Sequence, residues 1–128
     1  GVSSSMAIPS RGNDARFTIN AITNPENIDK VETAAMEELT RFIAEGPTAQ
    51  ELIDAKKAFL ESAKLSRNSD GAIAGQLISN LHLGRTFAFS AEQEKRIAEV
   101  TIEDIKAAFS KYIDPKKLVI LRAGDFKK

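Results

Sequence analysis

The sequence predicts an α+β fold, a two-layer sandwich in which helices pack on one face of a sheet. Three observations support this class. Residues 15–21 alternate apolar and polar side chains, which is typical of a half-buried strand. Residues 25–112 carry apolar side chains at spacings of three and four, which indicates successive amphipathic helices. Residues 118–121 form a compact apolar run, which predicts a closing strand.

A β-hairpin is predicted at the N-terminus. Gly1–Pro9 consists mostly of small residues and favours a weak strand that is ended by its proline. Pro9–Asp14 contains the serine, glycine and asparagine that are typical of a turn. Ala15–Thr23 then alternates apolar and polar positions, so one of its faces should be buried.

Two long helices should follow and pack as an antiparallel pair, because about three residues join them. Asn24 and Pro25 supply a cap and a first helical residue, and Gly46 ends the first helix. Thr48 and Glu51 form a capping box that starts the second helix. The apolar stripes comprise Ile28, Val31, Ala35, Leu39 and Phe42 in the first helix and Leu52, Ala55, Phe59 and Ala63 in the second.

Three further helices and the closing strand complete the predicted order. The third helix follows a break at residues 68–71. Ser90 with Gln93 predicts a capping box for a short helix over residues 92–99, and Thr101 caps the last helix. The inward-facing residues should be Ile73, Leu77, Ile78 and Leu81 in the third helix and Ile105, Phe109 and Tyr112 in the last. The closing strand should return to pair with the N-terminal hairpin.

Composition limits the possible partners. The 128 residues suit a single domain, residues 1–128, with a core that removes about two thirds of the unfolded surface from water. Eighteen basic residues balance eighteen acidic ones, so we expect no nucleic-acid partner. No apolar run reaches the roughly 18 residues of a membrane span. With no cysteine and no recognisable secretion signal, the compartment stays open between bacterial periplasm and cytoplasm.

No set of residues can form a metal site, a nucleophile system or a phosphate cradle. His82 is the only histidine, whereas zinc hydrolases use several ligands, so we expect a structural or solvent-facing role for it. Glu37 and Glu38 diverge by about 100° on a helix, which favours a solvated face over an acid pair. Ser3–Ser5 lack an elbow motif, and Gly71–Gly75 lack the Lys-Ser/Thr pair of a phosphate loop. The sequence assigns no catalytic, metal-binding or substrate-binding residue.

Residues 84–90, Gly-Arg-Thr-Phe-Ala-Phe-Ser, are the most unusual stretch. One interpretation is structural: Phe87 and Phe89 anchor a loop to the core, and Arg85 caps the preceding helix end. The alternative is that the loop lines a partner or substrate surface. Lysines occur as short pairs rather than as a basic stripe, at residues 56–57, 116–117 and 127–128.

The succession of motifs resembles a known family. Thr23–Asn27 leads into the first long helix, and Glu45–Leu52 joins it to the second. Val100–Ile105 and Tyr112–Pro115 then precede the terminal run Leu118–Asp125. In this order and spacing the motifs resemble the C-terminal part of the pitrilysin/insulinase-type zinc peptidases, the M16 family, and above all its bacterial zinc proteases. The resemblance covers almost the whole chain.

The resemblance implies an incomplete fold of the LuxS/processing-peptidase-like metallohydrolase type. In that family an N-terminal domain carries the zinc motif His-x-x-Glu-His, which this chain lacks, since His82 is followed by Leu83–Thr86. We therefore expect no cofactor in this chain and zinc in the N-terminal domain of its parent, a zinc metalloendopeptidase. The family's substrate-binding arginine and tyrosine lie in a segment that would end just before Gly1. The arginines and tyrosine present here do not match them: Arg11, Arg16, Arg85 and Tyr112.

The chain is thus expected to be a non-catalytic C-terminal fragment that encloses and binds peptide substrates together with the N-terminal catalytic domain. One alternative is a scaffold or interaction domain of an inactive homologue, such as a processing-peptidase partner subunit. Another is an unrelated α+β binding module whose contact surface is residues 84–90. Because the chain starts with Gly1 rather than Met, leading strands should be missing, and we expect self-association through the exposed edge of the N-terminal strand.

Overall fold

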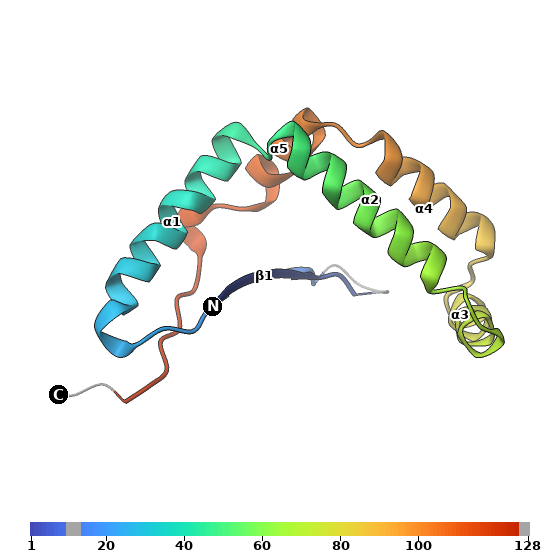
Figure 1. Ribbon diagram of the computed structural model, residues 1–128, viewed down its shortest axis with the longest axis horizontal. Coiled ribbons are helices and arrows are strands. Elements are labelled where there is room, and N and C mark those ends of the chain that lie inside the picture. Colours follow the sequence, from blue (N-terminus) through green and yellow to red (C-terminus); the bar gives the residue numbers. More distant parts are fainter. Residues whose placement is uncertain (10–13, 126–128) are drawn as a thin grey trace.

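The computed structural model describes residues 1–9 and 14–125 and confirms the α+β class (Figure 1). An antiparallel pair of strands forms the sheet, and the helices follow it in the chain. The turn predicted at Pro9–Asp14 falls mostly on residues 10–13, which lie outside the described residues. The elements are β1 (Val2–Ala7), β2 (Arg16–Ala21), η1 (Pro25–Asn27), α1 (Ile28–Glu45), α2 (Ala49–Leu65), α3 (Asp70–Leu83), α4 (Phe87–Glu99), α5 (Ile102–Tyr112) and η2 (Pro115–Lys117).

The predicted hairpin forms, with Val2 opposite Ala21 and Ala7 opposite Arg16. Its apolar face turns toward α1 and α5. The ring of Phe17 meets the ring of Phe109 edge to face, with 5.8 Å between the ring centroids. The ring of Phe42 meets the same ring with 4.8 Å between the centroids. Such T-shaped contacts are favourable because the positive edge of one ring meets the negative face of the other.

The helices form two groups that meet at the top of an arch (Figure 1). α1 packs mainly against α5, and α2 packs mainly against α4. The predicted antiparallel pairing of α1 with α2 is therefore wrong. The physical reason lies at Gly46, whose φ of 77° turns the chain away from α1, while the apolar stripe of α1 faces the sheet and α5. We call α2, α3 and α4 the helical arm.

The observed helix caps agree only in part with those predicted from the sequence. Thr48 with Glu51 and Thr101 with Asp104 both form complete capping boxes. Asn24 makes no side-chain cap and is followed by the 3₁₀ turn η1 instead of α-helix. The capping box predicted at Ser90 is wrong, because α4 already begins at Phe87 and places Ser90 inside the helix.

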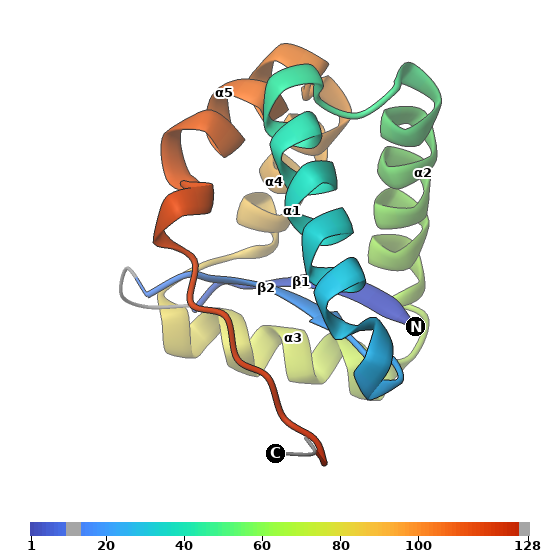
Figure 2. The same cartoon turned by 90° about the vertical axis from the view of Figure 1, so that its left-hand side faces the viewer.

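The predicted closing strand is the largest correction within the described residues. Residues 118–121 are extended but have no strand partner. After η2 this segment runs beside α1 and past the hairpin (Figure 2). Arg122 holds it there, because its guanidinium donates to Glu32 and pairs with Asp29 on α1. The segment is thereby kept on α1 and apart from β2.

The chain does not close around a core of the expected size. It exposes 10218 Å², whereas a compact monomer of this mass exposes about 6,700 Å². The prediction that two thirds of the unfolded surface is buried is therefore wrong, and the buried share is about half. Among the described residues, Leu39 is the one buried large apolar side chain, at 4% exposure. Side chains that were predicted to face inward lie exposed instead: Leu77, Ile78, Leu81 and Tyr112.

Candidate functional site

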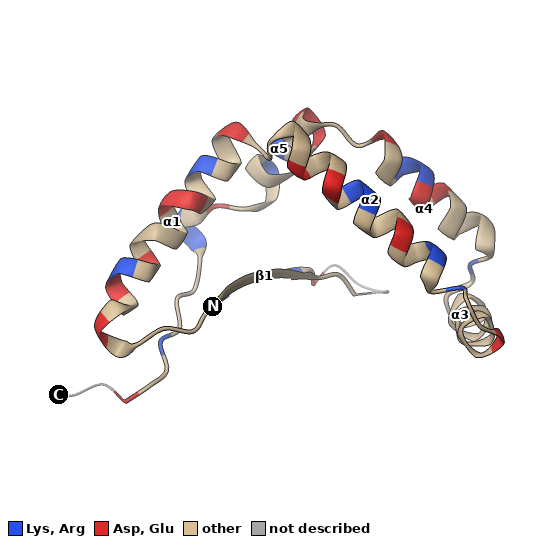
Figure 3. Ribbon diagram, viewed as in Figure 1, with Lys and Arg blue, Asp and Glu red and all other residues tan. Residues whose placement is uncertain are grey.

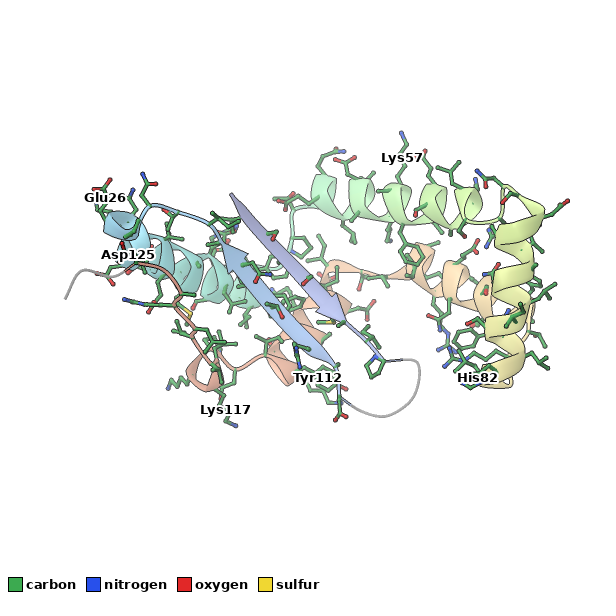
Figure 4. The ribbon with its side chains drawn as sticks, turned by 90° about the horizontal axis from the view of Figure 1, so that it is seen from below. Glu26, Lys57, His82, Tyr112, Lys117 and Asp125 are labelled. Carbon is green, nitrogen blue, oxygen red and sulfur yellow. The ribbon has the colours of Figure 1, made fainter. Side chains whose placement is uncertain are left out.

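The titratable residues considered in the sequence do not gather into a chemical centre. No three His, Cys, Asp or Glu side chains of the described ranges lie close enough to hold a metal ion. His82 is exposed in the last turn of α3, at the far end of the helical arm (Figure 4). Arg16 begins β2 and Tyr112 ends α5, while Arg11 lies outside the described residues. The ring of Tyr112 is exposed and has the Lys111 ammonium 5.0 Å from its centroid.

The acidic pair on α1 points to solvent. Glu37 and Glu38 are both exposed. Glu38 accepts a hydrogen bond from Arg41 at 3.0 Å, and this bond lowers the pKa of its carboxyl group from the ordinary value. A carboxylate that is held ionised by a neighbouring guanidinium is poorly suited to donate a proton. The pair therefore belongs to the charged outer surface of α1.

Residues 84–90 are not the loop that either interpretation assumed. Gly84 ends α3 in the left-handed conformation, with φ of 65°, and α4 starts at Phe87. The Arg85 guanidinium lies 4.3 Å from the centroid of the Phe89 ring, a cation–π contact. Both phenylalanine rings remain partly exposed, so they do not anchor a loop to the core.

Charges of both signs are mixed along most of the helices, whereas α3 carries one charged residue, Asp70. Lysine, arginine, aspartate and glutamate alternate along α1, α2 and α4, whereas the strand β1 carries none (Figure 3). This pattern gives no basic stripe that could follow a phosphate backbone. None of the helices in the described part of the chain combines the length and apolar character of a membrane-crossing helix.

Two hollows flank the hairpin instead. The first lies between the sheet and α1, has a volume of about 520 Å³ and is almost wholly apolar. The second, which we call the edge groove, lies between β2 and residues 118–123 and has a volume of about 640 Å³. Val31, Ala35 and Met36 of α1 line its floor. Both volumes are in the range of binding sites for small molecules or peptide segments.

The backbone of β2 presents unused hydrogen-bonding groups to the edge groove. Gly1 and Ile22 exchange two backbone hydrogen bonds of 2.9 and 3.0 Å, so they are a hydrogen-bonded pair of the antiparallel ladder. This pair determines which residues of β2 bond to β1 and which do not. In an antiparallel pair, the residues that bond the partner strand alternate with residues that point away from it. Phe17, Ile19 and Ala21 are the outward set, and no backbone partner for them is present among the described residues.

The face of the hairpin that turns away from α1 and α5 is polar. Side chains of residues that stand opposite each other in the register lie on the same face of the hairpin. Because successive side chains of a strand point to opposite faces, every second pair belongs to the polar face and the pairs between belong to the apolar face. Seen from below, the hairpin lies in front of the helices with this face open (Figure 4). We call it the polar face, and its residues are Ser3, Ser5, Ala7, Arg16, Thr18 and Asn20.

Sequence reasoning missed the edge groove. The signal that could have revealed it is the apolar run at residues 118–121, which is long enough for a strand but has only one predicted hairpin to pair with. The polar face follows directly from the period-two pattern of β2.

Comparison with known proteins gives two matches. Residues 1–59, which span the hairpin, α1 and much of α2, match the family described as the peptidase M16 inactive domain. Over 112 residues the chain is 24% identical to the "Probable zinc protease PqqL" of Escherichia coli (strain K12), which covers 88% of this chain. The chain spans only 12% of the length of that relative. No solved structure matches.

Proposed function

Because residues 1–59 match the inactive domain of M16 peptidases and the chain resembles a probable zinc protease, we propose that it is a C-terminal domain of this family and acts as a non-catalytic wall of a zinc metallopeptidase. In this role residues 1–128 act as one unit that helps enclose and bind peptide substrates. The zinc ion and the catalytic groups belong to an N-terminal domain of the same protein, which is the direct partner of this chain.

The incomplete core is the observation that carries this proposal. The surface of 10218 Å² exceeds that of a compact monomer by about 3,500 Å². A stable protein–protein interface buries about 1,200–2,000 Å² in total. The excess is therefore large enough for an extensive contact with another domain. Exposed apolar side chains on α3 and at residues 118–121 supply the apolar surface that such a contact needs.

The polar face supports contact with peptides. It offers hydroxyl and amide groups from Ser3, Ser5, Thr18 and Asn20 and a single cation, Arg16. Such groups hydrogen-bond to the peptide backbone of any sequence, whereas strong local charge would select particular substrates. A peptidase that encloses unfolded peptides needs a wall of this tolerant kind.

The test uses the protein at the length at which the cell makes it, which we call the natural-length protein. We expect zinc-dependent peptidase activity that a chelator removes, and none from residues 1–128 alone. Thr18→Val with Asn20→Ala should raise KM several-fold while kcat stays within about twofold, because only substrate binding is weakened. Thr40→Val is the matched control, since that exposed hydroxyl donates only within α1.

Three results would contradict the proposal. Zinc-dependent cleavage by residues 1–128 alone would place the chemistry in this chain. An unchanged KM in the polar-face variant would remove the substrate-binding role. A natural-length protein without peptidase activity would favour the scaffold domain of an inactive homologue.

A further inference from the structure

The helix α3 carries an exposed aliphatic stripe at the far end of the helical arm (Figures 1 and 4). This α3 stripe consists of Ala74, Leu77, Ile78 and Leu81. We propose that it joins two copies of the protein, whose α3 helices pack antiparallel about a twofold axis. The inference goes beyond the proposed function, because it concerns neither zinc nor peptide substrates. The surface is also distinct from the strand edge at which the sequence predicts self-association.

The face of α3 that is turned into the arm is polar. Asn80 is only 9% exposed, and its side-chain Nδ2 has no hydrogen-bond partner in the described part of the chain. Gln76 donates through Nε2 to the Ser90 hydroxyl of α4 at 3.5 Å. A surface helix ordinarily buries its aliphatic side chains and exposes its amides. α3 does the reverse, so its aliphatic stripe needs cover from outside the arm.

Both ends of α3 hold the helix in this orientation. The Ser69 hydroxyl accepts the N–H of Ala72 at 3.3 Å. At the other end, the left-handed conformation of Gly84 lets the Arg85 N–H donate to the Asn80 carbonyl at 2.8 Å. Short links, residues 66–69 and 84–86, join these ends to α2 and α4. The helix therefore cannot turn its stripe inward without disrupting both caps.

The α3 stripe has the pattern of a seam between two helices. Its members occupy positions i, i+3, i+4 and i+7, which lie on one side of a helix. Leu77, Ile78 and Leu81 are 51%, 70% and 84% exposed. Between Asp70 and Arg85 the sequence has no aspartate, glutamate, lysine or arginine, whereas the other α-helices carry several each (Figure 3). An uncharged aliphatic patch of this kind marks a protein-protein contact.

The layout of the stripe is complementary to itself. Its midpoint lies between Leu77 and Ile78, and a twofold axis at this point places Leu77 opposite Ile78 of the partner subunit. Ala74 then lies opposite Leu81 of the partner subunit, so a small side chain meets a large one at both ends of the seam. A contact between identical surfaces requires this symmetry, whereas cover by a different domain does not. The symmetry therefore favours a second copy.

Charge favours the antiparallel direction. The same axis brings Asp70 opposite Arg85 of the partner subunit. The Arg85 guanidinium lies 4.3 Å from the centroid of the Phe89 ring, and a guanidinium stacked by its face can still donate to a carboxylate at its edge. A parallel pair would place two copies of Asp70 side by side and would align the two helix dipoles unfavourably.

The length of the seam sets its strength. The 14 residues of α3 span about 21 Å at about 1.5 Å per residue. A seam of one helix per copy is smaller than a standard interface, which buries about 1,200–2,000 Å² in total. We therefore expect a weak dimer with a Kd in the micromolar range.

Sedimentation velocity of the natural-length protein tests the inference. The average mass should rise from monomer toward dimer between about 1 and 100 μM. Ile78→Asp should raise the Kd of the dimer at least about tenfold, because it places an unpaired carboxylate in the seam. Ile53→Asp is the matched control, since Ile53 is also exposed, at 58%, but lies on α2. It should leave the Kd unchanged. A protein that stays monomeric, or equal Kd values for the two variants, would overturn the inference.

Disulfide trapping tests the antiparallel register, since residues 1–128 contain no cysteine. A mixture of Ala74→Cys and Leu81→Cys natural-length proteins should form a linked dimer under mild oxidation. Helix axes about 8–10 Å apart bring facing Cα atoms within disulfide reach. Neither variant alone should link to itself, because identical positions are offset by about 10 Å along the seam. Peptide mapping identifies the linked residues.

Two outcomes of the trapping would contradict the proposed dimer. Absence of the mixed link would remove the pairing of Ala74 with Leu81. A link formed by Ala74→Cys alone would indicate a parallel pair. Both readouts are independent of peptidase activity, so a protein that gives the expected links but cleaves no peptide would refute only the proposed function.

Discussion

Arg122 and Glu32 are joined across 90 positions of the sequence by two hydrogen bonds to one carboxylate oxygen. This pair and the adjacent contact with Asp29 tie the C-terminal segment to α1. Both partners are partly exposed, so their importance lies in the placement of the segment more than in overall stability.

Arg122→Ala should therefore release residues 118–123 without unfolding the chain. We expect these residues to be cut several-fold faster by limited proteolysis, while the denaturation midpoint changes little. Arg96→Ala is the matched control, because it breaks an exposed pair with Glu92 inside α4. Equal cleavage of the wild type and Arg122→Ala would show that other contacts place the segment.

The Arg67–Glu94 pair should make stability depend on pH. Arg67 donates to Glu94 at 3.2 Å, and this hydrogen bond lowers the pKa of the Glu94 carboxyl from its ordinary 4.5. A lowered pKa in the folded state contributes stability above 4.5, and that stability is lost as the pH falls through the lowered value. Between pH 7 and pH 3, the free energy of unfolding measured with denaturant should fall less for Glu94→Gln than for the wild type. Parallel curves would exclude a contribution from this pair.

The capping box of α5 offers a clean comparison with an uncapped helix. The Thr101 hydroxyl accepts the Asp104 N–H at 3.1 Å, whereas the Thr86 side chain makes no cap hydrogen bond at the start of α4. Thr101→Ala should cost about 1 kcal/mol in urea unfolding, because a helix donor loses its partner. Thr86→Ala should cost only a few tenths of that, and similar losses for both would argue against the capping role.

Two glycines should respond to alanine in opposite directions. Gly46 has φ of 77°, and a Cβ there would lie 2.8 Å from Cγ of Lys106. Gly46→Ala should therefore destabilise the chain by more than about 1 kcal/mol. Gly75 lies inside α3, and a Cβ there would meet nothing within 4 Å. Gly75→Ala should stabilise the chain by about 0.5–1 kcal/mol. Thermal unfolding should show a lower midpoint for Gly46→Ala and a higher midpoint for Gly75→Ala than for the wild type.

Local features were predictable because short-range chemistry determines them. The hairpin follows from the alternation in β2, and the helix starts follow from the capping box at Thr48 and the cap residue Thr101. The resemblance to the C-terminal part of M16 peptidases, drawn from motif order, is confirmed by the comparisons. The fold class is confirmed as α+β, and the finer fold name stays a prediction.

The errors concern contacts between distant elements. An apolar stripe indicates which face of a helix is buried, but it does not indicate which element packs against that face. The stripe of α1 meets α5 and the sheet where α2 was predicted, because the backbone at Gly46 redirects the chain. Leu118–Leu121 likewise has the composition of a strand, but a strand also needs a neighbour. The edge groove was missed for the same reason, although the apolar run at residues 118–121 carried a signal of it.

The two links that join the helical arm to the rest of the chain also lie close together. A Cβ at Gly46, just before α2, would fall 3.1 Å from the side chain of Ile102, which follows the end of α4 by three positions. A module that departs and returns at neighbouring points can change its length or surface during evolution while the hairpin, α1 and α5 keep their geometry. Homologues can therefore diversify in this arm while they retain the remainder of the architecture.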